Sequence, residues 1–224
     1  MKKLTLLFLF SILQIILHGQ HDFGLKAGFG LSKLVAERHL MNPTKFIFTP
    51  SWQAGCFYNF NLNKTSLIGV ELLFVQIEST EHAKFIYTDA LGNPLGVDGS
   101  INTDYHLSYL SVPIYYGLKL KKLAIHLGIQ AGLAVTNSAH QKTETPYNGQ
   151  ILRSETTGKM NIDKYDAGIK GALIYNLSKR FSVEAGYYCG VNNIMSNNAP
   201  SEWNWKIQQI TLGLRYKIFT KDRK

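Results

Sequence analysis

The stretch LAIHLGIQAGLAVT (residues 123–136) carries the pattern that decides the fold. Every second residue from Leu123 to Val135 is apolar, whereas the residues between them are small or polar, His126 and Gln130 among them. Successive side chains of a β-strand point to opposite faces, so this period of two predicts a strand with one apolar face and one polar face.

The same alternation recurs in seven other segments. We predict strands over residues 22–32, 51–62, 66–77, 104–120, 123–136, 162–177, 180–191 and 206–219. Short links (63–65, 121–122, 178–179) alternate strictly with long ones (33–50, 78–103, 137–161, 192–205). This alternation is typical of an up-and-down barrel in an outer membrane, with short periplasmic turns and long extracellular loops.

The apolar face of these strands must point toward lipid. The opposite face carries Gly, Ala, Ser, Asn, Gln and charged residues. A soluble lipocalin-like carrier has the reverse arrangement, and eight strands enclose too little space for an apolar core inside a polar shell. We therefore predict an all-β protein, an eight-stranded antiparallel up-and-down transmembrane β-barrel with a polar lumen.

The first residues have the features of an export signal. Lys2 and Lys3 precede a largely apolar stretch, residues 4–17, which is too short for a good membrane helix. We predict a cleaved signal peptide over residues 1–20 and a barrel domain over 21–224. The expected location is the outer membrane of a Gram-negative cell.

The composition limits the classes of binding partner that we expect. The formal net charge is +9, yet the positive residues form no single stripe and no recognition-helix pattern occurs, which argues against nucleic acid. Basic residues instead collect at the short-turn end of the predicted strands, where anionic phospholipid headgroups would meet them. They are Lys64, Lys121, Lys122, Lys179, Arg180, Lys221, Arg223 and Lys224. Outer-membrane lipids are the expected partners.

Charged residues on the inward face predict a polar network in the lumen. Lys26, Glu71, Glu184 and Arg215 lie a few residues from the turn end of their strands, so we expect them at one depth, where buried charges must pair. Such a salt-bridge layer would plug the barrel; a gated or selective path is the alternative. The predicted network comprises Lys26, Glu71, His126, Lys170, Glu184 and Arg215.

Aromatic residues near the predicted strand ends suggest the girdles that outer-membrane barrels place at the two membrane interfaces. The alternative is that sheets are simply rich in aromatic residues. The candidates are Phe23, Trp52, Tyr58, Phe60, Phe181, Tyr216 and Phe219.

One strand contains a proline and also carries a family likeness. Pro113 cannot donate a ladder hydrogen bond, which predicts a bulge there. Its segment, Tyr109-Leu110-Ser111-Val112-Pro113-Ile114, resembles the Tyr-Leu-x-x-Pro strand of the PorT-like outer-membrane β-barrel family. Segments 23–28, 127–132 and 190–194 resemble other strands of that family. The resemblance implies an outer-membrane barrel without known catalysis or catalytic residues, in a family whose namesake is tied to protein secretion.

No motif predicts catalysis, a metal site or a cofactor. His106-Leu107-Ser108 places a histidine near a serine, as in outer-membrane lipid A deacylases, but no acid partner is identifiable in the sequence. His126 stands alone on its face, without a second ligand at metal-binding spacing. Cys56 and Cys189 could form a disulfide, but the topology separates them, so two small apolar residues on strands are the favoured interpretation.

The predicted function is that of a structural or interaction barrel. Its partners would bind the extracellular loops or the periplasmic rim, and residues 84–97 could extend two strands as a hairpin beyond the membrane. The alternatives are a narrow transport barrel, a component linked to protein secretion, a lipid-modifying barrel enzyme and a soluble carrier.

Overall fold

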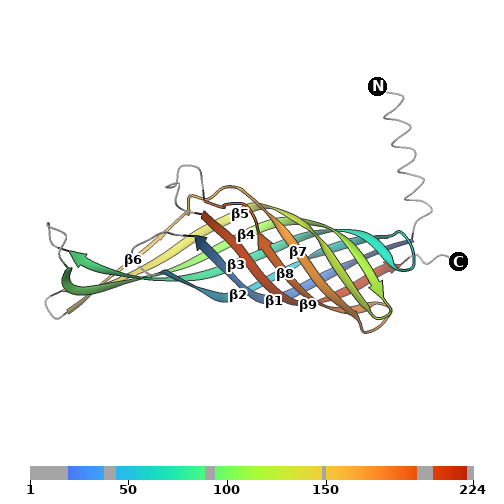
Figure 1. Cartoon of the computed structure of the whole chain (residues 1–224), viewed down its shortest axis with the longest axis horizontal. Helices are drawn as coiled ribbons and strands as arrows, with labels where there is room; N and C mark the ends of the chain where they lie inside the picture. Colours follow the sequence, from blue (N-terminus) through green and yellow to red (C-terminus); the bar gives the residue numbers. More distant parts are fainter. Residues whose placement is uncertain (1–19, 38–43, 89–93, 148–149, 196–203, 221–224) are drawn as a thin grey trace, which may run out of the picture.

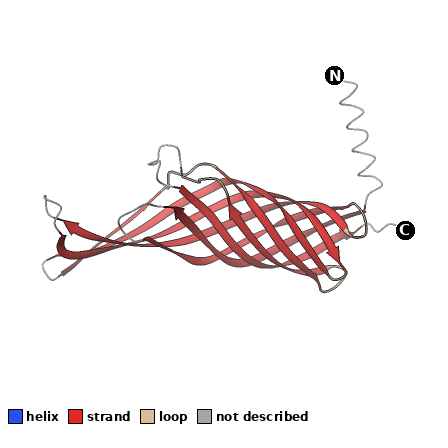
Figure 2. Cartoon of the chain, viewed as in Figure 1, coloured by secondary structure: helices blue, strands red, loops and turns tan. Residues whose placement is uncertain are grey.

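The computed structural model describes residues 20–37, 44–88, 94–147, 150–195 and 204–220, and these residues form β-strands joined by turns (Figures 1 and 2). The strands are β1 (Gln20–Glu37), β2 (Thr44–Asn61), β3 (Ser66–Thr88), β4 (Pro94–Leu120), β5 (Leu123–Tyr147), β6 (Gln150–Gly158), β7 (Tyr165–Asn176), β8 (Phe181–Gly190) and β9 (Asn204–Thr220). Within this described part of the chain, no helix is long and apolar enough to cross a membrane. The predicted leader lies outside it, apart from Gln20, which begins β1.

Eight of the strands close into a ring. Each strand pairs antiparallel with the next along the chain, from β1 to β5 and from β7 to β9; β5 pairs with β7 and β9 pairs with β1. Strand β6 pairs with β5 only and lies outside the ring. The predicted eight-stranded up-and-down barrel is therefore confirmed.

Three short turns gather at one end of the barrel, as predicted. In the β2–β3 turn the Asn63 side-chain oxygen accepts hydrogen bonds from the backbone N–H groups of Thr65 and Ser66, at 2.8 and 2.7 Å. In the β7–β8 turn the Ser178 hydroxyl oxygen accepts from the N–H groups of Arg180 and Phe181. Asn and Ser close tight turns through such local bonds, which explains why these links are short.

Two hairpins continue past the other end of the barrel (Figure 1). The β3–β4 ladder extends as far as the pair of Thr88 and Pro94, with a register shift between Ile86 and Thr88, so the predicted hairpin around residues 84–97 is confirmed. The predicted loop at 137–161 is wrong in large part, because β5 continues to Tyr147 and β6 pairs back along it. All nine residues of β6 are exposed. Because both faces of this strand meet water, its sequence lacks the alternation of apolar and polar residues by which a strand is predicted.

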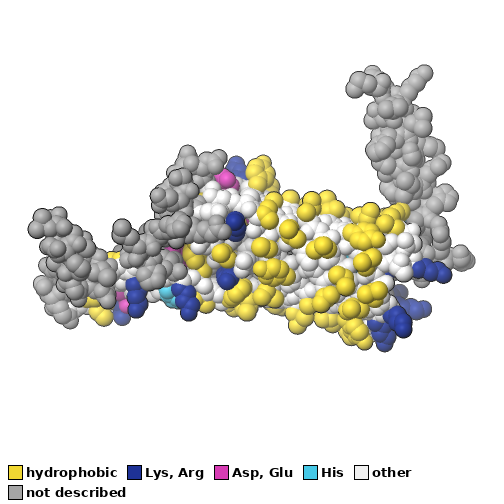
Figure 3. All heavy atoms as spheres, viewed as in Figure 1, with side chains coloured by type: hydrophobic (Ala, Val, Ile, Leu, Met, Phe, Trp, Pro, Cys, Tyr) yellow, Lys and Arg dark blue, Asp and Glu magenta, His cyan; other side chains and the backbone are white. Residues whose placement is uncertain are grey.

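The outer surface of the ring is apolar. Phe29, Leu127 and Ile129 expose 77%, 63% and 66% of their surface, whereas the residues between them on the strands are buried or half-buried. Figure 3 shows hydrophobic side chains distributed over the barrel wall and basic side chains at its turn end. This exposure is what a lipid-facing wall requires, because hydrocarbon is the solvent there.

The interior is only partly polar, which corrects the expectation of a polar lumen throughout. An apolar cluster occupies much of the half of the barrel nearer the loop end, beside buried polar side chains such as Asp166 and Gln209. It consists of Leu34, Leu73, Val75, Ile77, Tyr105, Leu107, Tyr109, Tyr188, Ile194, Met195, Trp205 and Ile207. Eight strands therefore enclose an apolar core and a polar layer in series, one above the other along the axis.

The predicted bulge at Pro113 is also wrong. Pro113 pairs with Gln130 of β5 in an unbroken register, and the irregularity between β4 and β5 lies between Ser108 and Tyr109 instead. In the pairing of β4 with β3 the register before and after the proline is the same, but Val112 and Pro113 themselves form no pair with β3. The missing N–H is thus absorbed by a gap in the ladder, without an inserted residue.

Candidate functional site

The polar layer is built around Glu71, on β3. Its Oε2 atom accepts hydrogen bonds from Lys26 Nζ at 3.0 Å and from Lys170 Nζ at 3.3 Å, and its Oε1 atom accepts from Arg215 Nη1 at 2.8 Å. The three cations come from β1, β7 and β9. A single carboxylate therefore ties three strands to β3 across the lumen.

Glu184 of β8 is the second acceptor in this layer. Lys26 Nζ donates to its Oε1 atom at 2.5 Å, and Arg215 Nη1 donates to its Oε2 atom at 2.6 Å. The side chains of Lys26, Glu71, Glu184 and Arg215 are all at most 4% exposed. Charges so far from water are stable only when they are paired and hydrogen-bonded, as these are.

Two rings that sequence reasoning missed hold Arg215. Its guanidinium carbon lies 4.0 Å from the centre of the Phe57 ring, and its Nη2 atom donates to the Tyr115 hydroxyl at 3.1 Å. The Tyr115 hydroxyl in turn donates to Asn59 Oδ1 at 2.7 Å. Phe57 and Tyr115 lie on the polar face of their strands. A large aromatic residue on that face was the sequence feature that could have predicted their contact with the buried charges.

Two glycines make room for these rings. A Cβ atom at Gly69 would lie 2.3 Å from ring carbons of Tyr115, and one at Gly24 would lie 2.6 Å from the Phe57 ring and 2.1 Å from the Tyr216 carbonyl oxygen. Neither position tolerates a side chain without a shift of its neighbour. The small residues of the inward face therefore fix where the large ones pack.

The predicted network residue His126 lies beside the ion pairs and makes no ion pair within the part of the chain described. Its ring stacks on Tyr115, with centroids 4.4 Å apart and planes 17° apart. The structure thus brings Lys26, Glu71, Lys170, Glu184 and Arg215 into direct contact with one another and connects His126 to them through Tyr115.

Six of the candidate interface aromatics lie on the outer wall near the turn ends of their strands, whereas Trp52, which was expected to begin its strand, lies in the middle of β2, because that strand begins at Thr44. Phe181 and Tyr216 are in contact, with centroids 4.8 Å apart, and Tyr58 stacks on His21. A register shift between the Phe23 and Gly24 pairs brings Phe219 opposite Phe23. The remaining two candidates are Phe60, which contacts the His21 ring, and Trp52, which contacts Phe74.

The His106–Ser108 pair has an acid neighbour that the sequence did not reveal. His106 Nδ1 lies 3.5 Å from Glu78 Oε1, and Glu78 accepts a hydrogen bond from Gln76 at 2.7 Å. Among the described residues, however, the Ser108 hydroxyl makes no hydrogen bond to His106. The side chains lack the serine–base contact that nucleophilic catalysis uses.

The described residues contain no group of three or more His, Cys, Asp and Glu side chains placed to hold a metal ion. Cys56 on β2 and Cys189 on β8 are both free thiols. In the ring β1 and β9 lie between their strands, so three strand spacings of ~4.8 Å separate the two backbones, too far for a disulfide.

The sequence also matches a family model, that of the outer membrane protein beta-barrel domain, over residues 19–196. The chain belongs to this family. It is an integral outer-membrane β-barrel protein. No curated protein sequence matches it.

Solved outer-membrane barrels are similar to it in structure. They include the attachment invasion locus protein Ail of Yersinia pestis in complex with the heparin analogue sucrose octasulfate (14% identity, 88% of this chain and 99% of that chain, TM-score 0.40). Neisserial surface protein A is another (12% identity, 88% and 97%, TM-score 0.41). The outer membrane protease OmpT of Escherichia coli also matches (8% identity, 89% and 97%, TM-score 0.38).

Proposed function

We propose that this protein is a non-conducting interaction barrel of PorT-like type, which presents its extracellular hairpins to partners while its lumen stays plugged. The mature protein begins after a leader of about 20 residues that is removed on export. No catalytic step and no cofactor are part of this function. Outer-membrane lipids surround the apolar wall.

The observation that carries the proposal is the series arrangement of two seals. The ion-pair layer around Glu71 lies toward the turn end, and the apolar cluster lies beyond it toward the loop end on each strand that contributes to both. On β3, Leu73 is the next inward residue after Glu71 toward the loop end. On β9, Ile207 lies on the loop-end side of Arg215. Permeating ions would have to break the first seal and then dehydrate at the second.

The shape of the extracellular part supports the interaction role. Strands β3, β4, β5 and β6 continue as one sheet beyond the ring, and its surface mixes both signs of charge, such as Arg153 donating to Glu144 at 3.0 Å. The outer edge of β6 pairs with no described strand. Exposed strand edges are templates on which an extended partner segment can add a strand.

Planar-bilayer recording tests the proposal directly. We expect the purified wild-type barrel to insert without a stable conductance at either polarity. A steady, wide conductance from pure protein would favour the narrow transport barrel instead. Folding of the sample is verified independently by its heat-dependent gel mobility, so that a silent bilayer cannot result from misfolded protein.

A further inference from the structure

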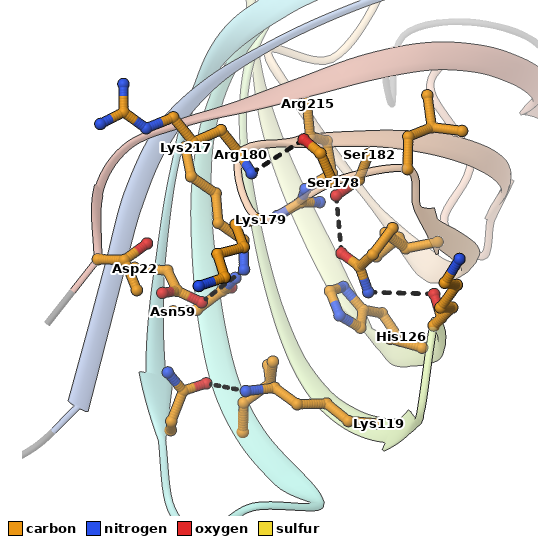
Figure 4. Close-up of a pocket in the computed structure, with 18 of the residues that line it drawn as sticks. Asp22, Asn59, Lys119, His126, Ser178, Lys179, Arg180, Ser182, Arg215 and Lys217 are labelled. Carbon is orange, nitrogen blue, oxygen red and sulfur yellow. Dashed lines mark hydrogen bonds and ion pairs between the residues drawn. The ribbon is translucent and has the colours of Figure 1, made fainter. Parts of the chain in front are cut away.

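The periplasmic mouth of the barrel contains a cavity that the plug does not use. Its volume is about 730 Å³, and every strand of the ring contributes to its lining (Figure 4). Arg215 and His126 line its inner end, and the β4–β5 and β7–β8 turns line its opening. A volume in this range is that of a small-molecule site. Because the ion-pair layer lies behind it, this mouth cavity is a blind vestibule.

The charge in the mouth cavity is one-sided. Six basic residues besides Arg215 line it: Lys119, Lys121, Lys122, Lys179, Arg180 and Lys217. The lining contains one carboxylate, Asp22, which accepts a hydrogen bond from Lys217 at 3.1 Å. Cations brought together in a concave site with low-dielectric walls raise the local concentration of anions.

One of these basic residues, Lys121, lies at a position of the β4–β5 turn where lysine is unfavourable for the backbone. Lys121 adopts φ 55°, and it is the one non-glycine residue with positive φ in the described residues. Two-residue hairpin turns favour Asn or Gly at such a position, because a Cβ atom is unfavourable there. Lysine is therefore a poor choice for the turn itself, whereas it adds a charge at the rim of the cavity.

Hydrogen bonds between neutral groups hold the wall of the cavity in place. The Asn176 side chain donates to the Lys122 carbonyl at 3.1 Å and accepts from the Ser182 hydroxyl at 2.8 Å. These bonds fasten the β4–β5 turn to the ends of β7 and β8, which follow it around the rim of the ring. The cavity wall is thus set before any ligand arrives, which lowers the entropic cost of binding.

From this geometry we infer that the mouth cavity binds a phosphate-bearing anion with at least two negative charges near one another. Lysine and arginine together with amide and hydroxyl donors are the groups that recognise phosphate oxygens. The ligand is either a phospholipid of the periplasmic leaflet whose headgroup carries two phosphates, as cardiolipin does, or a soluble phosphorylated solute. This site is independent of the extracellular hairpins and of the proposed interaction role.

The test compares two variants that lose the same amount of charge at opposite ends. The turn-end variant carries Lys121→Gly, Lys122→Gln, Lys179→Gln and Arg180→Gln. The loop-end control carries Lys45→Gln, Lys84→Gln, Lys142→Gln and Arg153→Gln. All eight residues are exposed and lie outside the plug, so both variants should fold. Folding is verified by heat-dependent gel mobility before any binding measurement.

Pyrophosphate is titrated calorimetrically into full-length wild-type barrel in phosphatidylcholine nanodiscs. We expect binding that weakens about tenfold or more in the turn-end variant, since four exposed ionic contacts are lost together, and that is unchanged in the loop-end control. Binding should also weaken near 1 M salt, where the Debye length is ~3 Å. This outcome supports the site with a soluble phosphate as its ligand.

A second arm replaces part of the phosphatidylcholine with cardiolipin, whose headgroup carries two phosphates, and follows the amide NMR signals of the turn residues. Shifts that occur in wild type and in the loop-end control, and are lost in the turn-end variant, support the site with a lipid headgroup as ligand. The inference is overturned if neither probe binds, or if the loop-end control loses binding as much as the turn-end variant does.

Discussion

Lys26 and Arg215 lie directly opposite each other on β1 and β9 and share the same two carboxylates, Glu71 and Glu184. Like charges at paired positions of neighbouring strands normally repel. Here each cation contacts both anions, one reaching in from β3 and the other from β8. The strand pair that closes the barrel is therefore stable only when both carboxylates are in place.

Substituting Glu71→Gln should destabilise the barrel strongly. The amide keeps the shape but leaves Lys26, Lys170 and Arg215 with one carboxylate, and uncompensated buried charge costs about 3–5 kcal/mol. Urea unfolding in lipid vesicles, followed by tryptophan fluorescence, measures the loss. Glu144→Gln is the control, since its ion pair with Arg153 is exposed and should contribute at most ~1 kcal/mol. Equal losses in the two variants would contradict a special role for the buried layer.

Disrupting only one of the two seals should not make the barrel conduct ions. We expect Glu71→Ala/Arg215→Ala to remain silent in planar bilayers, because the apolar cluster still blocks the loop-end half of the lumen. Adding Tyr105→Ala and Trp205→Ala should produce a conductance, since these two rings pack edge to face across the cluster at 5.2 Å. Tyr105→Ala/Trp205→Ala alone is the matched control and should be silent. A conducting Glu71→Ala/Arg215→Ala variant would show that the seals are not in series.

The sequence predicted the wall of this barrel far better than its interior. Alternation assigned residues such as Leu127 and Ile129 to the lipid face, and the strict sequence of short and long links predicted the topology. The pairing of Lys26, Glu184 and Arg215 follows from strand order and depth. In contrast, the contact between Lys170 and Glu71 crosses the lumen between non-adjacent strands, where strand order carries no information.

The apolar half of the lumen escaped prediction for a different reason. On β3 the run Leu72-Leu73-Phe74-Val75 is apolar on both faces; the period of two counted from Glu71 points Leu73 and Val75 inward, but it does not show that the lumen around them is apolar. The inward residues of this run, Leu73 and Val75, are 0% and 2% exposed, whereas Leu72 is 47% exposed. The cluster that these residues form with residues of distant strands, such as Ile207, follows only from the closed ring.

Substituting Gly69→Ala should destabilise the barrel by about 1–3 kcal/mol through overpacking. The new Cβ atom would lie 2.3 Å from the Tyr115 ring, and a displaced ring loses its contacts with Arg215, Asn59 and His126. A double-mutant cycle with Tyr115→Leu measures the coupling in urea unfolding. We expect Gly69→Ala to lower the free energy of unfolding much less in the Tyr115→Leu background, because leucine leaves room for the new Cβ atom. Strictly additive losses would mean that the two positions do not compete for space.

Cysteine labelling should locate the two ends on opposite sides of the membrane. In a Cys56→Ser/Cys189→Ser background, Lys142→Cys on the outer part of β5 should react with a membrane-impermeant maleimide on intact cells. Lys122→Cys in the β4–β5 turn should react only after the outer membrane is permeabilised. Both lysines are exposed, so accessibility at the two sites differs only through the membrane. The reverse pattern would invert the assigned orientation.

Removing the β5–β6 hairpin should leave the barrel intact. His140 pairs with Thr157, so replacing residues 141–156 with Asn-Gly closes the hairpin by a two-residue turn of the favoured type. Because β6 lies outside the ring and is exposed along its whole length, we expect the urea midpoint and the heat-dependent gel mobility to be unchanged. Trypsin cleavage at Arg153 on intact cells should disappear with the hairpin. If the shortened chain failed to insert, the extracellular sheet would be part of the folding unit and not a separate surface for partners.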